Sequence, residues 1–126
     1  MANRFRVWAP AIAWASVLFL LSSLPALGGG LPIDDKLVHG VLYAVFGVTL
    51  GMGWSRAPSP VRHGLLLAVG ALYGVSDEWH QMYVPGRTPD LADWLADVCG
   101  LVVGYGTTVK LLGRNNIRDV DIEESR

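Results

Sequence analysis

Long apolar segments alternate with short polar ones along this chain. The apolar runs predict helices over residues 7–24, 37–54, 61–76 and 89–112, and breaks rich in Gly and Pro separate them at 28–32, 58–60 and 85–86. The first run carries no charge and approaches the roughly 20 residues that span a bilayer. The second and third are short for spans, but each can be lengthened by one turn at the end where polar groups cluster. This pattern predicts an all-α polytopic membrane protein, a compact four-transmembrane-helix bundle over residues 1–112, followed by a solvated, mobile polar tail over 113–126.

The first apolar run has a competing interpretation as a cleaved signal peptide. Arg4 and Arg6 supply a basic start, and small residues follow near positions 25–30. Three further apolar segments come after it, however, so we favour a membrane span.

Composition supports the membrane interpretation. The chain has 126 residues, of which 52% are hydrophobic and only 17% are charged, too apolar a balance for an ordinary soluble domain. The net charge of -1 and the absence of a long basic run disfavour nucleic acid as a partner. The lone Cys99 lies in an apolar run, so we expect a small buried residue without redox function.

The basic residues predict the orientation of the bundle in the membrane. If four helices cross, two basic residues, Lys36 and Arg87, fall on one side and eight fall on the other: Arg4, Arg6, Arg56, Arg62, Lys110, Arg114, Arg118 and Arg126. Because loops rich in Lys and Arg stay inside, both termini should be cytoplasmic in a bacterial inner-membrane protein. The polar stretch 77–97 would then lie on the outer face.

The fourth predicted helix carries its acidic residues on one face. A helix advances about 100° per residue, so Asp90, Asp93 and Asp97 fall within an arc of roughly 60°, and Gly100 and Gly104 continue the stripe. Glycines four apart favour close helix contact in membranes, so the acidic stripe should face the bundle interior. An unpaired carboxylate two turns inside a span is costly, which favours a functional role for Asp97.

The start of the fourth helix gives some of these residues a simpler interpretation. Thr88 followed by Pro89 is typical of an N-cap with proline at the first helical position. Asp90 and Asp93 could then serve only the beginning of the helix, where its dipole favours negative charge.

The second and third helices repeat the arrangement of polar groups above small residues. In the third, Gly70 and Gly74 lie below Asp77 and Gln81 on one face, with His80 beside them and Tyr73 a turn deeper. In the second, Asp35, His39 and Tyr43 are spaced four apart, Lys36 is adjacent, and Gly47 and Gly51 follow. We therefore expect a polar site at the outer mouth of the bundle, with Arg87 at the turn as the partner of its carboxylates.

These residues resemble a known family. The chain holds Asp35-Lys36-x-x-His39-x-x-x-Tyr43, then Asp77-Glu78-x-His80-Gln81, then Val84-Pro85-Gly86-Arg87, then Asp93-x-x-x-Asp97-x-x-Gly100. In order and spacing this is similar to the VanZ-like family of small bacterial membrane proteins, named for a member associated with resistance to the glycopeptide teicoplanin. The resemblance spans roughly residues 35–104 and implies a cell-envelope role.

The first functional hypothesis is binding or remodelling of an anionic envelope component, such as a lipid headgroup or a lipid-linked cell-wall precursor. Arg87 could hold a phosphate bidentately and Lys36 as a point charge, while carboxylates orient the cations or accept sugar hydroxyls. An excess of acid would repel a bare phosphate unless a metal bridges the acids or several are paired or protonated. The predicted binding residues are Asp35, Lys36, His39, Tyr43, Asp77, Glu78, His80, Gln81, Arg87, Asp93 and Asp97.

The second hypothesis is a membrane-embedded hydrolase or transferase. His80 or His39 would act as general base, oriented by Asp77 or Asp93, around a divalent metal bound by carboxylates and imidazole. The candidate metal ligands are Asp77, His80, Asp93 and Asp97. No HExxH, Ser-His-Asp or cysteine-nucleophile signature accompanies them.

The third hypothesis assigns the cluster no ligand. A self-satisfied network of carboxylates, His, Tyr and Arg can lock a helix bundle without binding anything. A structural lock, however, would need fewer ionisable groups than this chain carries.

Overall fold

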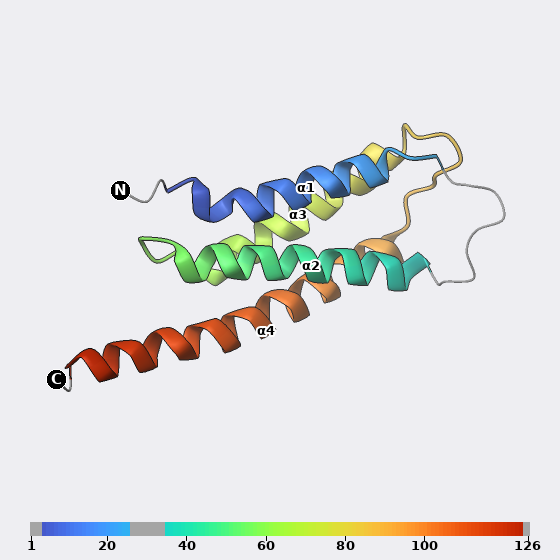
Figure 1. The fold of residues 1–126 in the computed structure, drawn as a ribbon. Coiled ribbons are helices and arrows are strands. Elements are labelled where there is room, and N and C mark those ends of the chain that lie inside the picture. The colour runs from blue at the N-terminus through green and yellow to red at the C-terminus, as the bar shows by residue number, and fades with distance from the viewer. Residues whose placement is uncertain (1–3, 26–34, 125–126) are drawn as a thin grey trace.

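The computed structural model describes residues 4–25 and 35–124, and the side chains among them up to residue 113. A short 3-10 helix, Arg6–Trp8, precedes four α-helices: α1 (Ala9–Ser22), α2 (Asp35–Arg56), α3 (His63–Gln81) and α4 (Leu91–Glu124). Helices that follow one another in sequence run in opposite directions, so the two termini lie at the same end of the bundle (Figure 1). The prediction of an all-α, four-helix protein is confirmed.

The helix boundaries differ from the predicted ones mainly at the polar end. α2 begins at Asp35, two residues before the predicted run 37–54, and α3 continues to Gln81, five residues beyond the predicted run 61–76. The polar groups of α2 and α3 therefore lie on helix. The glycine-rich break predicted at 28–32 lies outside the described residues.

Both ends of the fourth helix were predicted wrongly. The cap is Asp90, not Thr88, because the Oδ1 atom of Asp90 accepts the backbone N–H of Ala92 at 2.9 Å and the helix begins at Leu91. The backbone also stays helical past Leu112 to Glu124. Hydrophobic periodicity reports which residues are buried, not which are helical, and no proline interrupts the propagation of the helix there.

Glycines bring α2 and α4 into backbone contact along the largest helix–helix interface of the bundle. A Cβ on Gly100 would overlap the carbonyl oxygen of Gly40, and a Cβ on Gly104 would overlap that of Ala44. From the α2 side, a Cβ on Gly47 would come within 2.6 Å of the backbone nitrogen of Tyr105. The predicted close contact of the glycine stripe is confirmed, and it faces the interior as expected.

The glycines of α3 accept side chains of α4 instead of its backbone. Leu101, which is fully buried, packs so closely on Gly70 that a Cβ there would lie 2.5 Å from it. Gly74 faces the ring of Trp94, whose Nε1–H donates to the carbonyl of Ala71 at 3.0 Å. These contacts hold the polar ends of α3 and α4 next to each other.

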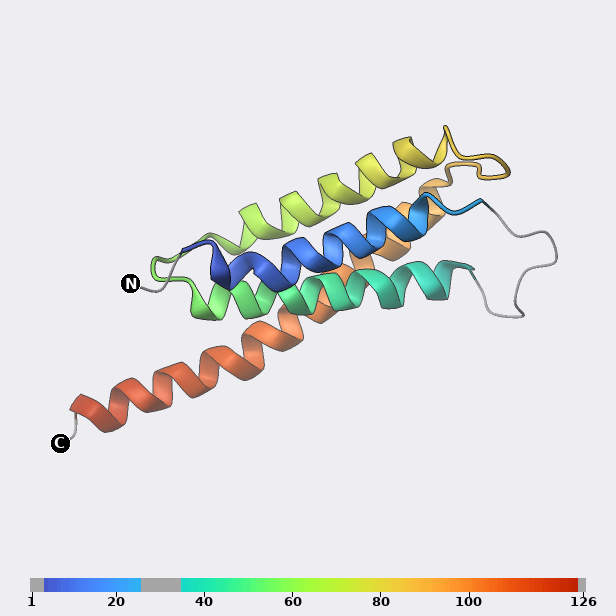
Figure 2. The ribbon, with the colours of Figure 1, turned by 45° about the horizontal axis from the view of Figure 1, so that its top comes forward.

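Two hydrogen bonds hold α1 in place, one donated by an aromatic side chain of α1 and one by an aromatic side chain of α3. Trp14 Nε1–H donates to the carbonyl of Leu42 in α2 at 2.9 Å, and the Tyr73 hydroxyl donates to the carbonyl of Ala15. α1 runs alongside α2 and α3 and packs against both (Figure 2). One end of α1 therefore reaches the region where the polar residues of α2 and α3 gather.

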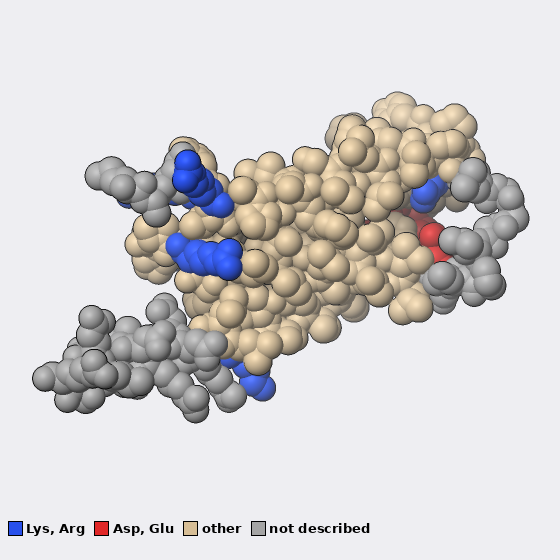
Figure 3. Space-filling view, viewed as in Figure 1, with Lys and Arg blue, Asp and Glu red and all other residues tan. Residues whose placement is uncertain are grey.

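The outside of the bundle is largely apolar. Two helical segments, Asp35–Arg56 and Leu91–Gly113, are long and apolar enough to cross a membrane, and Arg6–Ser22 is a shorter apolar helix. On the face drawn in Figure 3 the charged side chains gather at the two ends of the molecule, with none along the flank between them. These features indicate a membrane location, whereas four spans stay a prediction. Cys99, expected to be buried, is exposed on this outer surface.

Candidate functional site

A buried histidine–carboxylate pair joins α2 to α4 at the polar end of the bundle. His39 Nδ1 lies 2.8 Å from Asp97 Oδ1, and the two residues are only 7% and 1% exposed. An ionised Asp97 can only accept, so it fixes the Nδ1–H tautomer of a neutral His39. The other ring nitrogen, Nε2, then faces Asp93 Oδ2 at 3.9 Å and Asp35 Oδ2 at 4.0 Å.

The inner faces of α2 and α3 meet through a second polar contact. The Tyr43 hydroxyl donates to Asp77 Oδ2 at 3.3 Å, and Tyr43 is 2% exposed. Gln81, one turn beyond Asp77 on the same face of α3, is 3% exposed. The structure therefore brings together Tyr43, Asp77 and Gln81, as the sequence predicted.

Glu78 and Lys36 attach the beginning of α4 to its neighbours. Glu78 Oε2 accepts the backbone N–H of Asp90 at 3.0 Å. Lys36 Nζ lies 3.6 Å from carboxylate oxygens of both Asp90 and Asp93. Asp90 thus caps α4, pairs with Lys36 and binds Glu78 through its backbone, while its carboxylate stays half-exposed.

Two carboxylate oxygens in this region are buried without a hydrogen-bond or ion-pair partner among the described residues: Glu78 Oε1 and Asp97 Oδ2. Both side chains are at least nine-tenths buried. Asp93 Oδ1 is buried as well, but it has the Lys36 ammonium at 3.6 Å. Buried polar atoms in native proteins nearly always have a partner, so the two unpartnered oxygens point to a group that completes the site.

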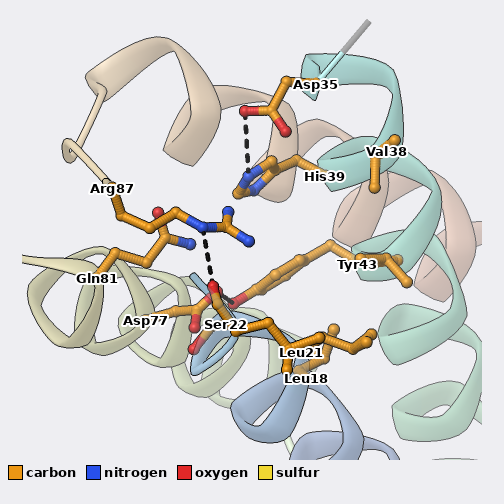
Figure 4. A pocket seen from close by; sticks show the side chains of 12 residues that line it. Leu18, Leu21, Ser22, Asp35, Val38, His39, Tyr43, Asp77, Gln81 and Arg87 are labelled. Atoms are coloured by element: carbon orange, nitrogen blue, oxygen red, sulfur yellow. Dashed lines mark hydrogen bonds and ion pairs between the residues drawn. The ribbon is translucent and has the colours of Figure 1, made fainter. Parts of the chain in front are cut away.

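A pocket of about 290 Å³ opens beside this cluster, between the ends of α1, α2 and α3. Figure 4 shows His39 and Tyr43 entering it from α2, and Asp77 and Gln81 from α3. Aliphatic side chains supply much of the remaining lining: Leu18, Leu21 and Leu24 from α1 and the residues after it, and Val38 and Leu42 from α2. The pocket therefore combines polar and apolar side chains.

Arg87 is positioned over this pocket by a tight turn. The backbone N–H of Arg87 donates to the carbonyl of Val84 at 3.2 Å, and Gly86 has a φ of 78°. Proline followed by a positive-φ glycine is the signature of a type II turn, so the predicted Pro85-Gly86 turn is confirmed. Arg87 Nε–H donates to the carbonyl of Leu24 at 3.3 Å (Figure 4), and no carboxylate within the described ranges forms an ion pair with it. The expected pairing of Arg87 with the acids is thus replaced by a backbone contact.

His80 lies on the other flank of α3 from Glu78. Its Nε2 is 2.9 Å from the hydroxyl of Ser23, and its ring stacks on Phe19 at a centroid distance of 4.7 Å. It does not line the pocket. The histidine that the structure brings among the carboxylates is His39.

Two groups of side chains have the spacing to hold a metal ion. One consists of Asp35, His39 and Asp93, and the other of His39, Glu78 and Asp97; within each group the ligand atoms lie within 4.8 Å of one another. Of the four ligands expected from the sequence, Asp93 and Asp97 occur in these groups, whereas Asp77 and His80 do not.

The apolar lining was the part of the site that the sequence did not reveal. Leu18 and Leu21 come from α1, which the polar pattern did not connect with the site. A helix that is apolar all round has no phase from which to infer its inward face. The lining side chains of α1 could therefore not be found from periodicity.

The comparisons agree with this architecture. The VanZ/LLP1 family matches residues 6–112, which include α1, α2, α3, the part of α4 up to Leu112 and every residue of the site. Comparison with curated proteins and with solved structures gives no match. The match covers well over half of the chain, so this protein belongs to the VanZ/LLP1 family and shares its membrane association.

Proposed function

We propose that this protein binds an anionic amphiphile of the bacterial envelope, a phospholipid or a lipid-linked cell-wall precursor, in the pocket between α1, α2 and α3. The observation that carries the proposal is the mixed lining of that pocket. Five aliphatic side chains share it with Arg87, His39, Gln81, Asp77 and other polar residues. Most small-molecule sites combine an apolar surface with a few polar groups that fix orientation.

Arg87 is the group that would hold the anion. Its contact with the Leu24 carbonyl uses only Nε, which leaves the two terminal nitrogens for a bidentate contact with phosphate. The backbone contact and the rigid turn hold the guanidinium at the pocket, so little conformational entropy is lost when it binds. Gln81 and the Asp77 carboxylate would then meet hydroxyl groups of the same headgroup.

The leucine side chains of the lining support an amphiphile rather than a free phosphate. An acyl or prenyl chain on Leu18, Leu21 and Leu42 would gain about 25 cal/mol for each Å² of apolar area removed from water, whereas inorganic phosphate gains nothing there. The mouth lies at the end of the bundle that carries the exposed Trp79 and Tyr83, residue types that are enriched at membrane interfaces. With the predicted cytoplasmic termini, this would be the outer face of the inner membrane.

Binding measurements on the purified protein in mild detergent test the proposal. We expect a polyprenyl monophosphate to bind at least about tenfold more tightly than the uncharged polyprenol, and Arg87→Lys to remove most of that difference. Arg62→Lys is the matched control, because Arg62 precedes α3 at the opposite end of the bundle. Phosphatidylglycerol in a parallel titration separates a phospholipid ligand from a precursor. Equal binding of phosphate and alcohol would refute the proposal.

The proposal extends to glycopeptide resistance, which the family resemblance suggests. A protein that occupies or remodels a lipid-linked precursor would change the amount exposed to teicoplanin. Expression in a susceptible bacterium should then raise the inhibitory concentration of teicoplanin, and the Arg87→Ala variant, at equal abundance in the membrane, should not. If the unaltered protein does not change the inhibitory concentration of teicoplanin, its function is lipid binding without a role in resistance.

The His39–Asp97 pair favours a second candidate function, a membrane-embedded hydrolase or transferase. A carboxylate on Nδ1 of a histidine that lines a pocket is the arrangement of a general base. Release of phosphate from a polyprenyl pyrophosphate by the purified protein, lost in His39→Gln, would establish turnover. Binding of the polyprenyl pyrophosphate without release of phosphate would support amphiphile binding and not catalysis.

A purely structural network explains the site less well. A network that only locks a bundle gains by satisfying every member, because a partly satisfied one costs more than an apolar core. Glu78 Oε1 and Asp97 Oδ2 lack partners within the part of the chain that the structure describes.

A further inference from the structure

We propose that His39, Glu78 and Asp97 form a binding site for a divalent transition-metal ion beside the amphiphile pocket, with which it shares His39, and that the ion binds whether or not the pocket holds a lipid. The three residues come from α2, α3 and α4, and each offers a ligand atom within 4.8 Å of the others. All three are buried, with exposed fractions of 7%, 8% and 1%.

Two unpartnered oxygens point to the ion. Glu78 uses Oε2 to accept the backbone N–H of Asp90, which leaves Oε1 buried and without a partner. Asp97 Oδ2 is also buried without a partner, while Asp97 Oδ1 lies 2.8 Å from His39 Nδ1. An ion bound here would take the place of the proton on His39 Nδ1, so that this nitrogen and the Asp97 carboxylate become ligands. Glu78 would keep Oε2 fixed by the protein and offer Oε1, which is how ligating carboxylates are oriented in metal sites.

The local charge also favours a cation. Glu78, Asp93 and Asp97 are buried together with Asp77, while the cation that pairs with this group, Lys36, lies half-exposed at its edge. Several buried carboxylates cannot all be ionised at a membrane boundary unless positive charge lies among them. A divalent ion would supply that charge where it is needed and would relieve the repulsion that the acids exert on an anionic ligand in the neighbouring pocket.

The donor set suggests the class of metal. Mg²⁺ and Ca²⁺ prefer sites made only of oxygen donors, whereas imidazole favours first-row transition ions. One imidazole nitrogen with two carboxylates therefore suits Zn²⁺ or Mn²⁺.

The test is direct metal binding by the full chain, purified in mild detergent with a chelator and then freed of the chelator. We expect one Zn²⁺ or Mn²⁺ per chain by elemental analysis after dialysis, a rise in the unfolding temperature with that ion, and no comparable rise with Mg²⁺. Glu78→Gln retains an acceptor for the Asp90 N–H but removes the charge, and should weaken binding by about tenfold or more. No bound ion and no thermal shift in the unaltered protein would overturn the proposal, whatever the variants do.

Two further variants locate the site. Asp90→Asn keeps the cap of α4 and changes an acid outside both metal-compatible groups, so its metal affinity should match that of the unaltered protein. Asp35→Asn changes the alternative group of Asp35, His39 and Asp93. Unchanged affinity in Asp35→Asn supports the proposed site, whereas loss there with retention in Glu78→Gln would assign the ion to the alternative group and refute the proposal. Lipid binding by the metal-free protein, measured separately, keeps the two proposals distinguishable.

Discussion

Gly100 of α4 lies directly against the backbone carbonyl of Gly40 in α2, so closely that a Cβ at position 100 would overlap the carbonyl oxygen. The contact joins two backbones, neither of which can move without shifting its helix. Gly104 repeats it one turn later against Ala44. The position of Asp97 next to His39 depends on this register.

Gly100→Ala should therefore separate α2 from α4. Forcing an extra methyl group into a packed interface costs about 1–3 kcal/mol, which thermal unfolding in detergent would detect as a lower midpoint. Gly106→Ala is the matched control, since a Cβ there meets nothing within 4 Å and alanine is the better helix former by up to about 1 kcal/mol. Equal destabilisation by both variants would contradict the close α2–α4 contact.

Gly86→Ala should disturb the turn that positions Arg87. The φ of 78° at Gly86 is costly for an L-residue with a Cβ, by about 1–2 kcal/mol. We expect slightly lower stability together with weaker binding of anionic amphiphile, both measured against the unaltered protein. Gly86→Asn should be milder, because asparagine tolerates positive φ better than alanine. If alanine and asparagine behave alike, the turn geometry is not what positions Arg87.

His39→Leu should destabilise the metal-free protein strongly, because it leaves the buried Asp97 carboxylate without its partner. Removing one member of a buried pair costs about 3–5 kcal/mol, whereas replacing both members with apolar residues is often much less harmful. The double variant with Asp97→Leu should therefore be more stable than His39→Leu alone in chemical unfolding. A double variant less stable than the single one would show that the pair is not coupled in this way.

The predicted orientation can be tested with single cysteines. In a Cys99→Ser background, Ser59→Cys should react with a membrane-impermeant maleimide only after the cells are opened, and Tyr83→Cys should react in intact cells. The physical reason is the excess of basic residues at the end of the bundle that holds Arg56 and Arg62. The opposite labelling pattern would invert the topology and place the pocket on the cytoplasmic side.

The sequence by itself determined the helices and the inward faces of three of them. Apolar runs broken by Gly and Pro predicted four helices, and glycines four apart predicted the face that α4 turns to the bundle interior. Spacing along one helix also predicted that Asp77 and Gln81 share a face with Gly70 and Gly74. These are properties of a single helix, so periodicity was sufficient to find them.

Only the tertiary structure decided how those faces meet. Glu78 and His80 are two residues apart on α3 and point to opposite flanks of the helix. Because of where α4 and α1 lie, Glu78 joins the carboxylate cluster and His80 contacts Ser23. The rotation of one helix against the next depends on contacts such as Gly100 with Gly40, which no single-helix pattern contains. For the same reason the sequence could not show that the uniformly apolar α1 supplies part of the lining of the pocket, or that His39 is the histidine that pairs with Asp97.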